Sequence, residues 1–215
     1  MADIRSAGPA GPARPPRPPL VPLFTSAPTP GTDESAFPKD PDSFAGMLMA
    51  FLCIGSVATA NIPRKLSDNG ITHILNVSSF PSIPNNINTP GITTLDCPID
   101  DSPSQSLFTI LLAALEFIET ANKDGCKIFV HCQAGISRSV AIVMCYMIWK
   151  THNTPDAILT EIQKYRPCAG PNIGFSVQIA LFAKHANAEC NVSLPLAEII
   201  NLAETEYNAL MAKQK

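Results

Sequence analysis

From about residue 50 onward, the sequence alternates short apolar runs with longer segments of helical periodicity. The apolar runs are typical of strands, at 51–54, 71–77, 92–96 and 127–130. The longer segments predict helices at 61–69, 107–121, 139–150, 154–165, 172–186 and 196–211. Strands that alternate with helices form a mostly parallel sheet with helices packed on it. We therefore expect an α/β fold with a central twisted sheet of about four to five strands.

The first 45 residues differ in composition, because eleven of the chain's 21 prolines lie there. Proline fixes φ and removes a backbone donor, so this arm is predicted to be disordered or extended. Its overlapping P-x-x-P-x-R strings, 9–14 and 12–17, are typical ligands of SH3-type domains, although they also arise by composition alone. The predicted organisation is an arm at 1–45, a globular domain at 46–190 and an amphipathic C-terminal helix or tail at 191–215.

Composition excludes several functional classes. The net charge of -3 lacks the basic surface that nucleic acid requires. The seven cysteines include no C-x-x-C pair, which argues against a zinc site and a disulfide framework. No secretory signal is expected, and the most apolar window, 140–149, is too short to span a bilayer. Reduced thiols favour a cytoplasmic or nuclear location.

The stretch H-C-Q-A-G-I-S-R-S, residues 131–139, joins a predicted strand to a helix that is apolar nearly all round. Gly135 permits a tight turn whose N–H groups form an anion-binding nest, and the helix N-terminus adds partial positive charge. The planar fork of Arg138 can hold two oxygens of one phosphate. The same setting favours the thiolate of Cys132, which would then attack phosphorus.

A leaving alkoxide or phenoxide also needs a proton. The stretch C-P-I-D-D-S-P, 97–103, follows a predicted strand and carries two carboxylic acids, Asp100 and Asp101. Either could serve as acid and then as base toward water, so the scheme requires neither metal nor cofactor.

The alternative is that Cys132 is a buried structural thiol in a strand–helix turn. Cys53 and Cys97, at predicted strand ends, are either partners that trap an oxidised Cys132 or ordinary core thiols.

The form H-C-x5-R-S resembles the phosphate-binding loop of cysteine-dependent protein phosphatases, in particular the dual-specificity branch. The stretches F-L-C-I-G-S-V-A-T-A-N, G-I-T-H-I-L-N-V-S, C-P-I-D-D-S and P-N-I-G-F-S-V-Q resemble other segments of that branch. The resemblance covers about residues 48–186, and the missing docking domain makes the chain similar to the small atypical members. It implies a phosphatase that acts on phosphotyrosine and phosphoserine or phosphothreonine through a cysteinyl-phosphate intermediate.

The resemblance also implies roles for individual residues. Cys132 would be the nucleophile, Arg138 the phosphate clamp and Asp101, ahead of Asp100, the general acid. Ser139 would assist departure of the thiolate, and His131 would order the loop. The substrate phosphate would be held by Gln133, Ala134, Gly135, Ile136, Ser137 and Arg138.

Two other functions are compatible with the loop. One is hydrolysis of a non-protein phosphoester such as a phosphoinositide, a glycan phosphate or an RNA 5′ end. The other is an inactive phospho-binding adaptor. The loop has Gln133 and Ile136 and no lysine, which favours a phosphoprotein, and the intact Cys132, Arg138 and Asp101 favour an enzyme.

Overall fold

The computed structural model describes residues 48–79, 91–187 and 194–213 of the chain. The proline-rich arm lies outside these residues, so its expected disorder stays a prediction. The described elements are, in order, β1 (Leu52–Ser56), α1 (Val57–Ala60), α2 (Pro63–Asp68), β2 (Ile71–Asn76), β3 (Thr93–Asp96), α3 (Phe108–Lys123), β4 (Lys127–Cys132), α4 (Arg138–Thr151), α5 (Pro155–Tyr165), α6 (Ile173–Ala186) and α7 (Leu196–Ala212).

The four described strands form one parallel sheet in the order β1-β4-β2-β3. The expected α/β fold is confirmed. In register, Ser56 of β1 lies opposite Cys132 of β4, and Asn76 of β2 lies opposite both His131 and Asp96. The carboxyl ends of all four strands therefore meet at one edge of the sheet, where parallel sheets place their ligands.

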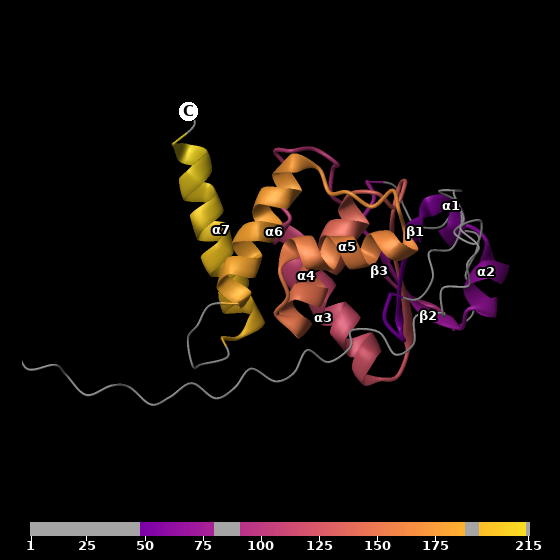
Figure 1. The fold of residues 1–215 in the computed structure, drawn as a ribbon. Coiled ribbons are helices and arrows are strands. Elements are labelled where there is room, and N and C mark those ends of the chain that lie inside the picture. The colour runs from indigo at the N-terminus through magenta and orange to yellow at the C-terminus, as the bar shows by residue number, and fades with distance from the viewer. Residues whose placement is uncertain (1–47, 80–90, 188–193, 214–215) are drawn as a thin grey trace, which may run out of the picture.

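The two faces of the sheet carry different helices and separate apolar clusters. Helices α3, α4, α5 and α6 lie on one side and α1 and α2 on the other (Figure 1). Side chains alternate along β4, so Val130 and Cys132 belong to the larger cluster and Phe129 belongs to the smaller one. Cys53 also belongs to the smaller cluster. It therefore lies on the opposite face from Cys132, and the suggestion that it could trap Cys132 is wrong.

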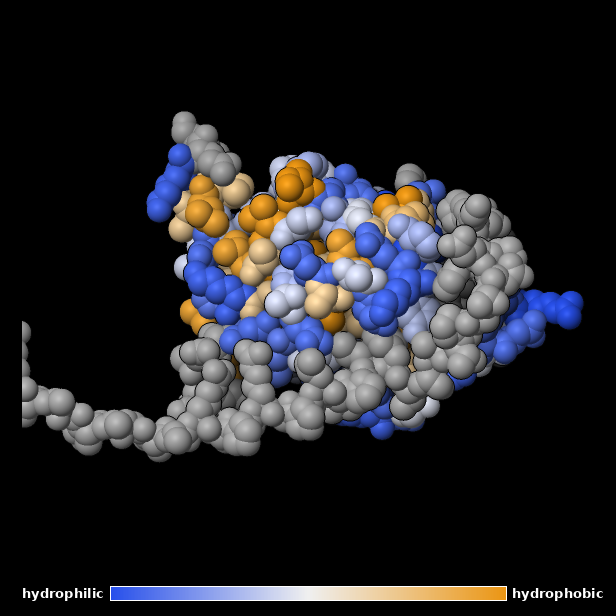
Figure 2. Space-filling view, in the orientation of Figure 1, coloured by the Kyte–Doolittle hydropathy of each residue, from blue (hydrophilic) through white to orange (hydrophobic). Residues whose placement is uncertain are grey.

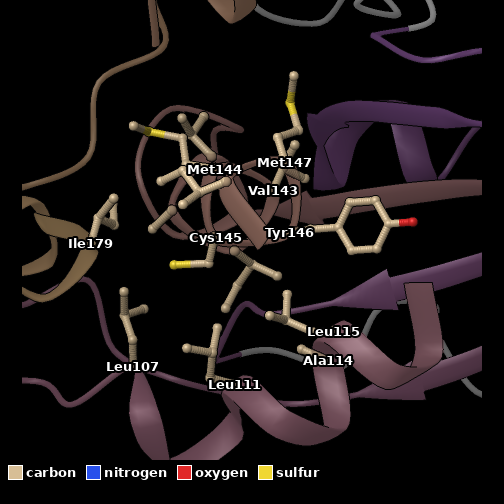
Figure 3. Close-up of a cluster of buried hydrophobic side chains, with 14 of the residues drawn as sticks. Leu107, Leu111, Ala114, Leu115, Val143, Met144, Cys145, Tyr146, Met147 and Ile179 are labelled. Carbon is tan, nitrogen blue, oxygen red and sulfur yellow. The ribbon is translucent and has the colours of Figure 1, made fainter. Parts of the chain in front are cut away.

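Helix α4 forms the centre of the larger cluster, as its uniformly apolar sequence predicts. Every residue from Arg138 to Ile148 is buried. Figure 3 shows Cys145 of α4 between Ile179 of α6 and Leu111 of α3, within this cluster. The loop that precedes α4 is therefore attached to a helix that is buried along most of its length.

Side-chain caps confirm two of the predicted helix starts. The Thr154 hydroxyl accepts a hydrogen bond from the Ala157 N–H at 3.3 Å, before α5. The Asn172 side chain accepts one from the Phe175 N–H at 2.9 Å, before α6. Each bond satisfies a helix N–H that has no partner within the helix. The four-residue α1 was not expected, because so short a helix gives no periodic signal.

Helix α7 packs on α6 and α3. Ile199, Ile200 and Ala203 are buried, and the Tyr207 ring lies 5.9 Å from the ring of Phe108. The Glu206 carboxylate also accepts a hydrogen bond from Lys184 of α6 at 2.7 Å. Part of the apolar stripe predicted at 196–211 is thus covered by the domain itself, whereas Leu202 and Leu210 stay exposed. Among the described residues, no helix is both long and apolar enough to cross a membrane.

We expect Tyr146→Phe to lower the free energy of unfolding by about 1–2 kcal/mol, because it removes a hydrogen bond to a carboxylate. The Tyr146 hydroxyl of α4 donates to Glu119 of α3 at 2.9 Å and accepts from Asn122 at 3.3 Å. Urea unfolding measures the loss. The control is Tyr207→Phe, because the Tyr207 hydroxyl makes no hydrogen bond to another described residue; its loss of unfolding free energy should stay below about 0.5 kcal/mol. Equal losses in both variants would show that the bond contributes nothing.

Candidate active site

Cys132 is the last residue of β4 and is 1% exposed. Its Sγ accepts hydrogen bonds from the Gly135 N–H at 3.2 Å and from the Ser139 hydroxyl at 3.4 Å. Gly135 belongs to the loop and Ser139 to the first turn of α4. The dipole of α4 also favours negative charge at this end. The sulfur therefore occupies a site that stabilises an anion.

The carbonyl oxygens of the loop are hydrogen-bonded away from Cys132. The Gln133 carbonyl accepts from the Val57 N–H at 3.2 Å, and the Ile136 carbonyl accepts from the Gly170 N–H at 2.9 Å. Arg166 donates to the carbonyls of Ala134 and Gly135, the first at 2.6 Å. In a trans peptide the N–H points opposite to the carbonyl, so these bonds turn the loop's N–H groups toward the sulfur. The loop is thus a nest for an anion.

Gly135 is required at the tightest point of this loop. Its φ is +67°, in the left-handed region that side chains disfavour. A Cβ there would also lie 2.4 Å from the carbonyl oxygen of Gly55 in β1. Both constraints select glycine, as the sequence predicted.

Arg138 is the first residue of α4, and its side chain is almost fully buried. Its Nη1 donates to the Ile99 carbonyl at 3.2 Å and to the Ser79 hydroxyl at 3.5 Å. Its Nε lies 3.5 Å from the Asp101 carboxylate, yet it is buried and makes no hydrogen bond within the described part of the chain. A buried donor of this kind is costly unless a ligand oxygen accepts from it. The guanidinium is therefore placed to bind an oxyanion.

The structure brings Asp101, rather than Asp100, to the loop. Asp101 accepts hydrogen bonds from the Ser137 hydroxyl at 2.7 Å and from the Asn172 side chain at 2.9 Å. Asp100 instead accepts from the Ser79 hydroxyl at 2.8 Å. Asp101 thus contacts the loop and the Arg138 guanidinium, whereas the Asp100 carboxylate bonds to a residue that follows β2.

Helix α6 holds the segment that carries Asp101. The buried Gln178 side chain accepts from the Leu107 N–H at 2.7 Å and donates to the Gln105 carbonyl at 2.8 Å. A Cβ added at Gly174 would lie only 1.9 Å from the Pro103 carbonyl oxygen, so the two backbones are in direct contact. These contacts fix the position of the Asp101 segment relative to the loop.

His131 is fully buried behind the loop and stacks on Phe129, with ring centroids 5.8 Å apart. Its Nδ1 lies 3.4 Å from the Cys132 carbonyl oxygen, so this nitrogen carries the proton. Burial lowers the pKa of His131 to about 4. A neutral imidazole hydrogen-bonded to the backbone is suited to ordering the loop.

The remaining loop residues divide between the surface and the interior. Gln133, Ala134 and Ile136 are exposed, whereas Ser137 is buried. The Ser137 hydroxyl accepts from the Asn172 N–H at 3.0 Å while it donates to Asp101. Its side chain therefore positions the carboxylate, and any contact of Ser137 with phosphate falls to its backbone.

The residues that sequence reasoning missed are Arg166, Asn172 as a partner of Asp101, and Gln178. All three belong to the stretch R-P-C-A-G-P-N-I-G-F-S-V-Q, residues 166–178. The stretch resembled the dual-specificity branch, but resemblance alone assigned these side chains no partner. The sequence carried no local signal for the contacts of Arg166, because the two carbonyls that it binds lie 31 and 32 residues earlier in the chain.

Comparison with known proteins identifies the class. The family model described as the dual specificity phosphatase catalytic domain matches residues 52–185. The chain is 37% identical over 136 residues to dual specificity protein phosphatase 22 of Homo sapiens, which covers 62% of this chain and 71% of that protein. It is 32% identical over 155 residues to dual specificity protein phosphatase 12 of Mus musculus, which covers 71% and 46%. The solved structure of DUSP15 superposes with a TM-score of 0.62 at 27% identity and covers 74% of this chain and 93% of that one.

The chain therefore belongs to the dual specificity phosphatase family, as a small atypical member. It is a phosphatase, and its relatives favour phosphoprotein substrates over the phosphoinositide, glycan and RNA alternatives. The domain boundaries expected at 46 and 190 bracket the matched residues but stay predictions.

The neutral, buried His131 predicts a loss of stability in mild acid. The unfolded chain binds a proton at this histidine near pH 6.5, whereas the folded chain does so only near pH 4. The unfolded state therefore gains protons first, and stability falls as pH falls through this interval. In urea unfolding, the wild type should lose roughly 2–3 kcal/mol more over that interval than His131→Asn, which keeps a donor toward the Cys132 carbonyl but cannot titrate. Parallel pH profiles for the two proteins would contradict the assignment.

Proposed function

We propose that this phosphatase hydrolyses phosphotyrosine and phosphoserine or phosphothreonine through a covalent phosphate on Cys132. The hydrogen bonds around the Cys132 sulfur support the proposal most strongly. Sγ accepts hydrogen bonds from Gly135 and Ser139 inside a loop whose carbonyls are all held outward. Such donors stabilise the thiolate and the phosphate that it attacks.

In the first step, the loop N–H groups from Gln133 to Arg138 and the Arg138 guanidinium bind the phosphate oxygens. The thiolate of Cys132 forms a bond to phosphorus as the bond to the substrate oxygen breaks. Asp101, in its protonated form, gives its proton to that leaving oxygen. The Asp101 carboxyl lies beside Arg138 and is held by Ser137 and Asn172, which supports its position next to the bound phosphate.

In the second step, the Asp101 carboxylate accepts a proton from water as the water oxygen attacks phosphorus. The sulfur–phosphorus bond breaks and the electron pair returns to Cys132. The Ser139 hydroxyl, which donates to Sγ at 3.4 Å, stabilises the departing thiolate. Inorganic phosphate is released, and Asp101 is again protonated for the next cycle.

The buried His131 contributes to catalysis by holding the start of the loop in place. Its bond to the Cys132 carbonyl fixes the peptide that begins the loop. The neutral ring stacks on Phe129, on the face of β4 opposite the Cys132 side chain, so we assign it no proton transfer in either step.

We expect Cys132→Ser to abolish hydrolysis of an aryl phosphate, and Asp101→Asn to lower kcat by about 10²–10⁴ for a substrate with a poor leaving group. Asp100→Asn is the matched control and should change kcat less than about threefold, because its carboxylate bonds to Ser79 instead of the loop. Turnover is measured across pH with a chelator present. Full activity in Cys132→Ser, or a larger loss in Asp100→Asn than in Asp101→Asn, would contradict the proposed roles.

A further inference from the structure

The described surface exposes few large apolar side chains, and half of them lie near the candidate active site. They are Ile62, Ile136, Ile173, Val177, Leu202 and Leu210. Ile173 is the most exposed, at 72%. Figure 2 shows hydrophobic residues at the surface over α6 and α7. Single exposed apolar residues are common, so their meaning depends on what adjoins them.

Backbone contacts place Ile136 and Ile173 at the border of the site. The Ile136 carbonyl accepts from Gly170, and the Ser137 hydroxyl accepts from the Asn172 N–H. The loop and the segment that enters α6 therefore run side by side. Ile173 directly follows Asn172, whose side chain donates to Asp101.

Val177 extends the same surface along α6, because residues four apart lie on one face of a helix. Gly174 and Gln178, one position further along, form the face that contacts the segment of Asp101. Ile173 and Val177 therefore lie next to that contact and remain exposed. We call Ile136, Ile173 and Val177 together the apolar rim.

Charge around the rim disfavours an acidic ligand. The charged residues of segments 97–106, 133–139 and 166–174 are Asp100, Asp101, Arg138 and Arg166. Both arginines are buried, and Arg166 is bonded to loop carbonyls. Within these three segments no exposed cation is present to attract a second phosphate or an acidic flanking residue, and the exposed Asp100 would repel one.

We propose that the apolar rim binds an aliphatic or aromatic side chain adjacent to the phosphorylated residue of a protein substrate. This inference deepens the proposed function and rests on it. The phosphate would bind at the loop while the neighbouring apolar side chain covers Ile173 and removes apolar surface from water. A contact enclosed in a hydrophobic pocket discriminates between substrates by about 10–200-fold, so an exposed rim should reach only the lower end of that range.

The test uses three phosphotyrosine peptides that differ only in the residues on each side of the phosphotyrosine: leucine, serine or glutamate. We expect the wild type to show kcat/KM about tenfold higher for the leucine peptide than for the serine peptide, and lowest for the glutamate peptide. In Ile173→Ser the leucine preference should fall to about twofold. Val177→Ser, a second change on the same rim, should also reduce it.

Leu202→Ser is the matched control, because Leu202 is a similarly exposed apolar residue on α7. It should keep the wild-type preference. Unchanged preference in both Ile173→Ser and Val177→Ser, or a wild type that prefers the glutamate peptide, would overturn the inference.

Aryl phosphate hydrolysis by the wild type separates the two possible failures. Turnover of aryl phosphate without any leucine preference overturns the apolar rim and leaves the proposed function intact. No turnover of aryl phosphate or of any peptide overturns both.

Discussion

The hydrogen bonds that hold the loop carbonyls outward are the interactions on which the site depends. Because each peptide is planar and trans, an outward carbonyl at one residue directs the next N–H inward. Arg166 makes two of these bonds and is itself buried. Loss of its side chain would leave two carbonyls without partners, at a cost of about 1–3 kcal/mol each when buried. The positive charge of Arg166 also adds to the favourable potential at the loop.

The parallel sheet then brings three separate chain segments to this loop. The carboxyl ends of β2, β3 and β4 lead to Ser79, Asp101 and Cys132, and the Arg138 guanidinium contacts the first two. The acid segment has a further attachment, because Gln178 of α6 fixes its backbone on both sides of Ser106. The nucleophile and the acid are thus positioned by elements of the same apolar cluster, because β4 carries Cys132 and α6 holds the segment of Asp101.

Local signals in the sequence predicted most of the fold. The buried α4, the helix starts at 154 and 172, and the left-handed Gly135 all follow from patterns within a few residues. The phosphate-binding role of Arg138 and the nucleophilic role of Cys132 were likewise predicted from one short stretch, residues 131–139.

The contacts that sequence reasoning missed all join residues distant along the chain. Arg166 reaches Ala134 and Gln178 reaches Leu107, and no spacing rule predicts either pair. The sequence also could not show on which face of the sheet Cys53 lies, because this depends on the pairing of β1 with β4. The choice between Asp101 and Asp100 followed from resemblance alone, and the hydrogen bonds of Ser137 and Asn172 now give it a physical basis.

The central claim is that phosphate passes through Cys132, and trapping the intermediate tests it most directly. Ser139→Ala removes the donor to the departing sulfur and should slow the second step more than the first. After this variant is mixed with aryl phosphate and quenched in acid, intact mass and peptide mapping should show one phosphoryl group on Cys132. A variant that turns over substrate with no phosphoryl group on the protein, or with the group on another residue, would contradict the account.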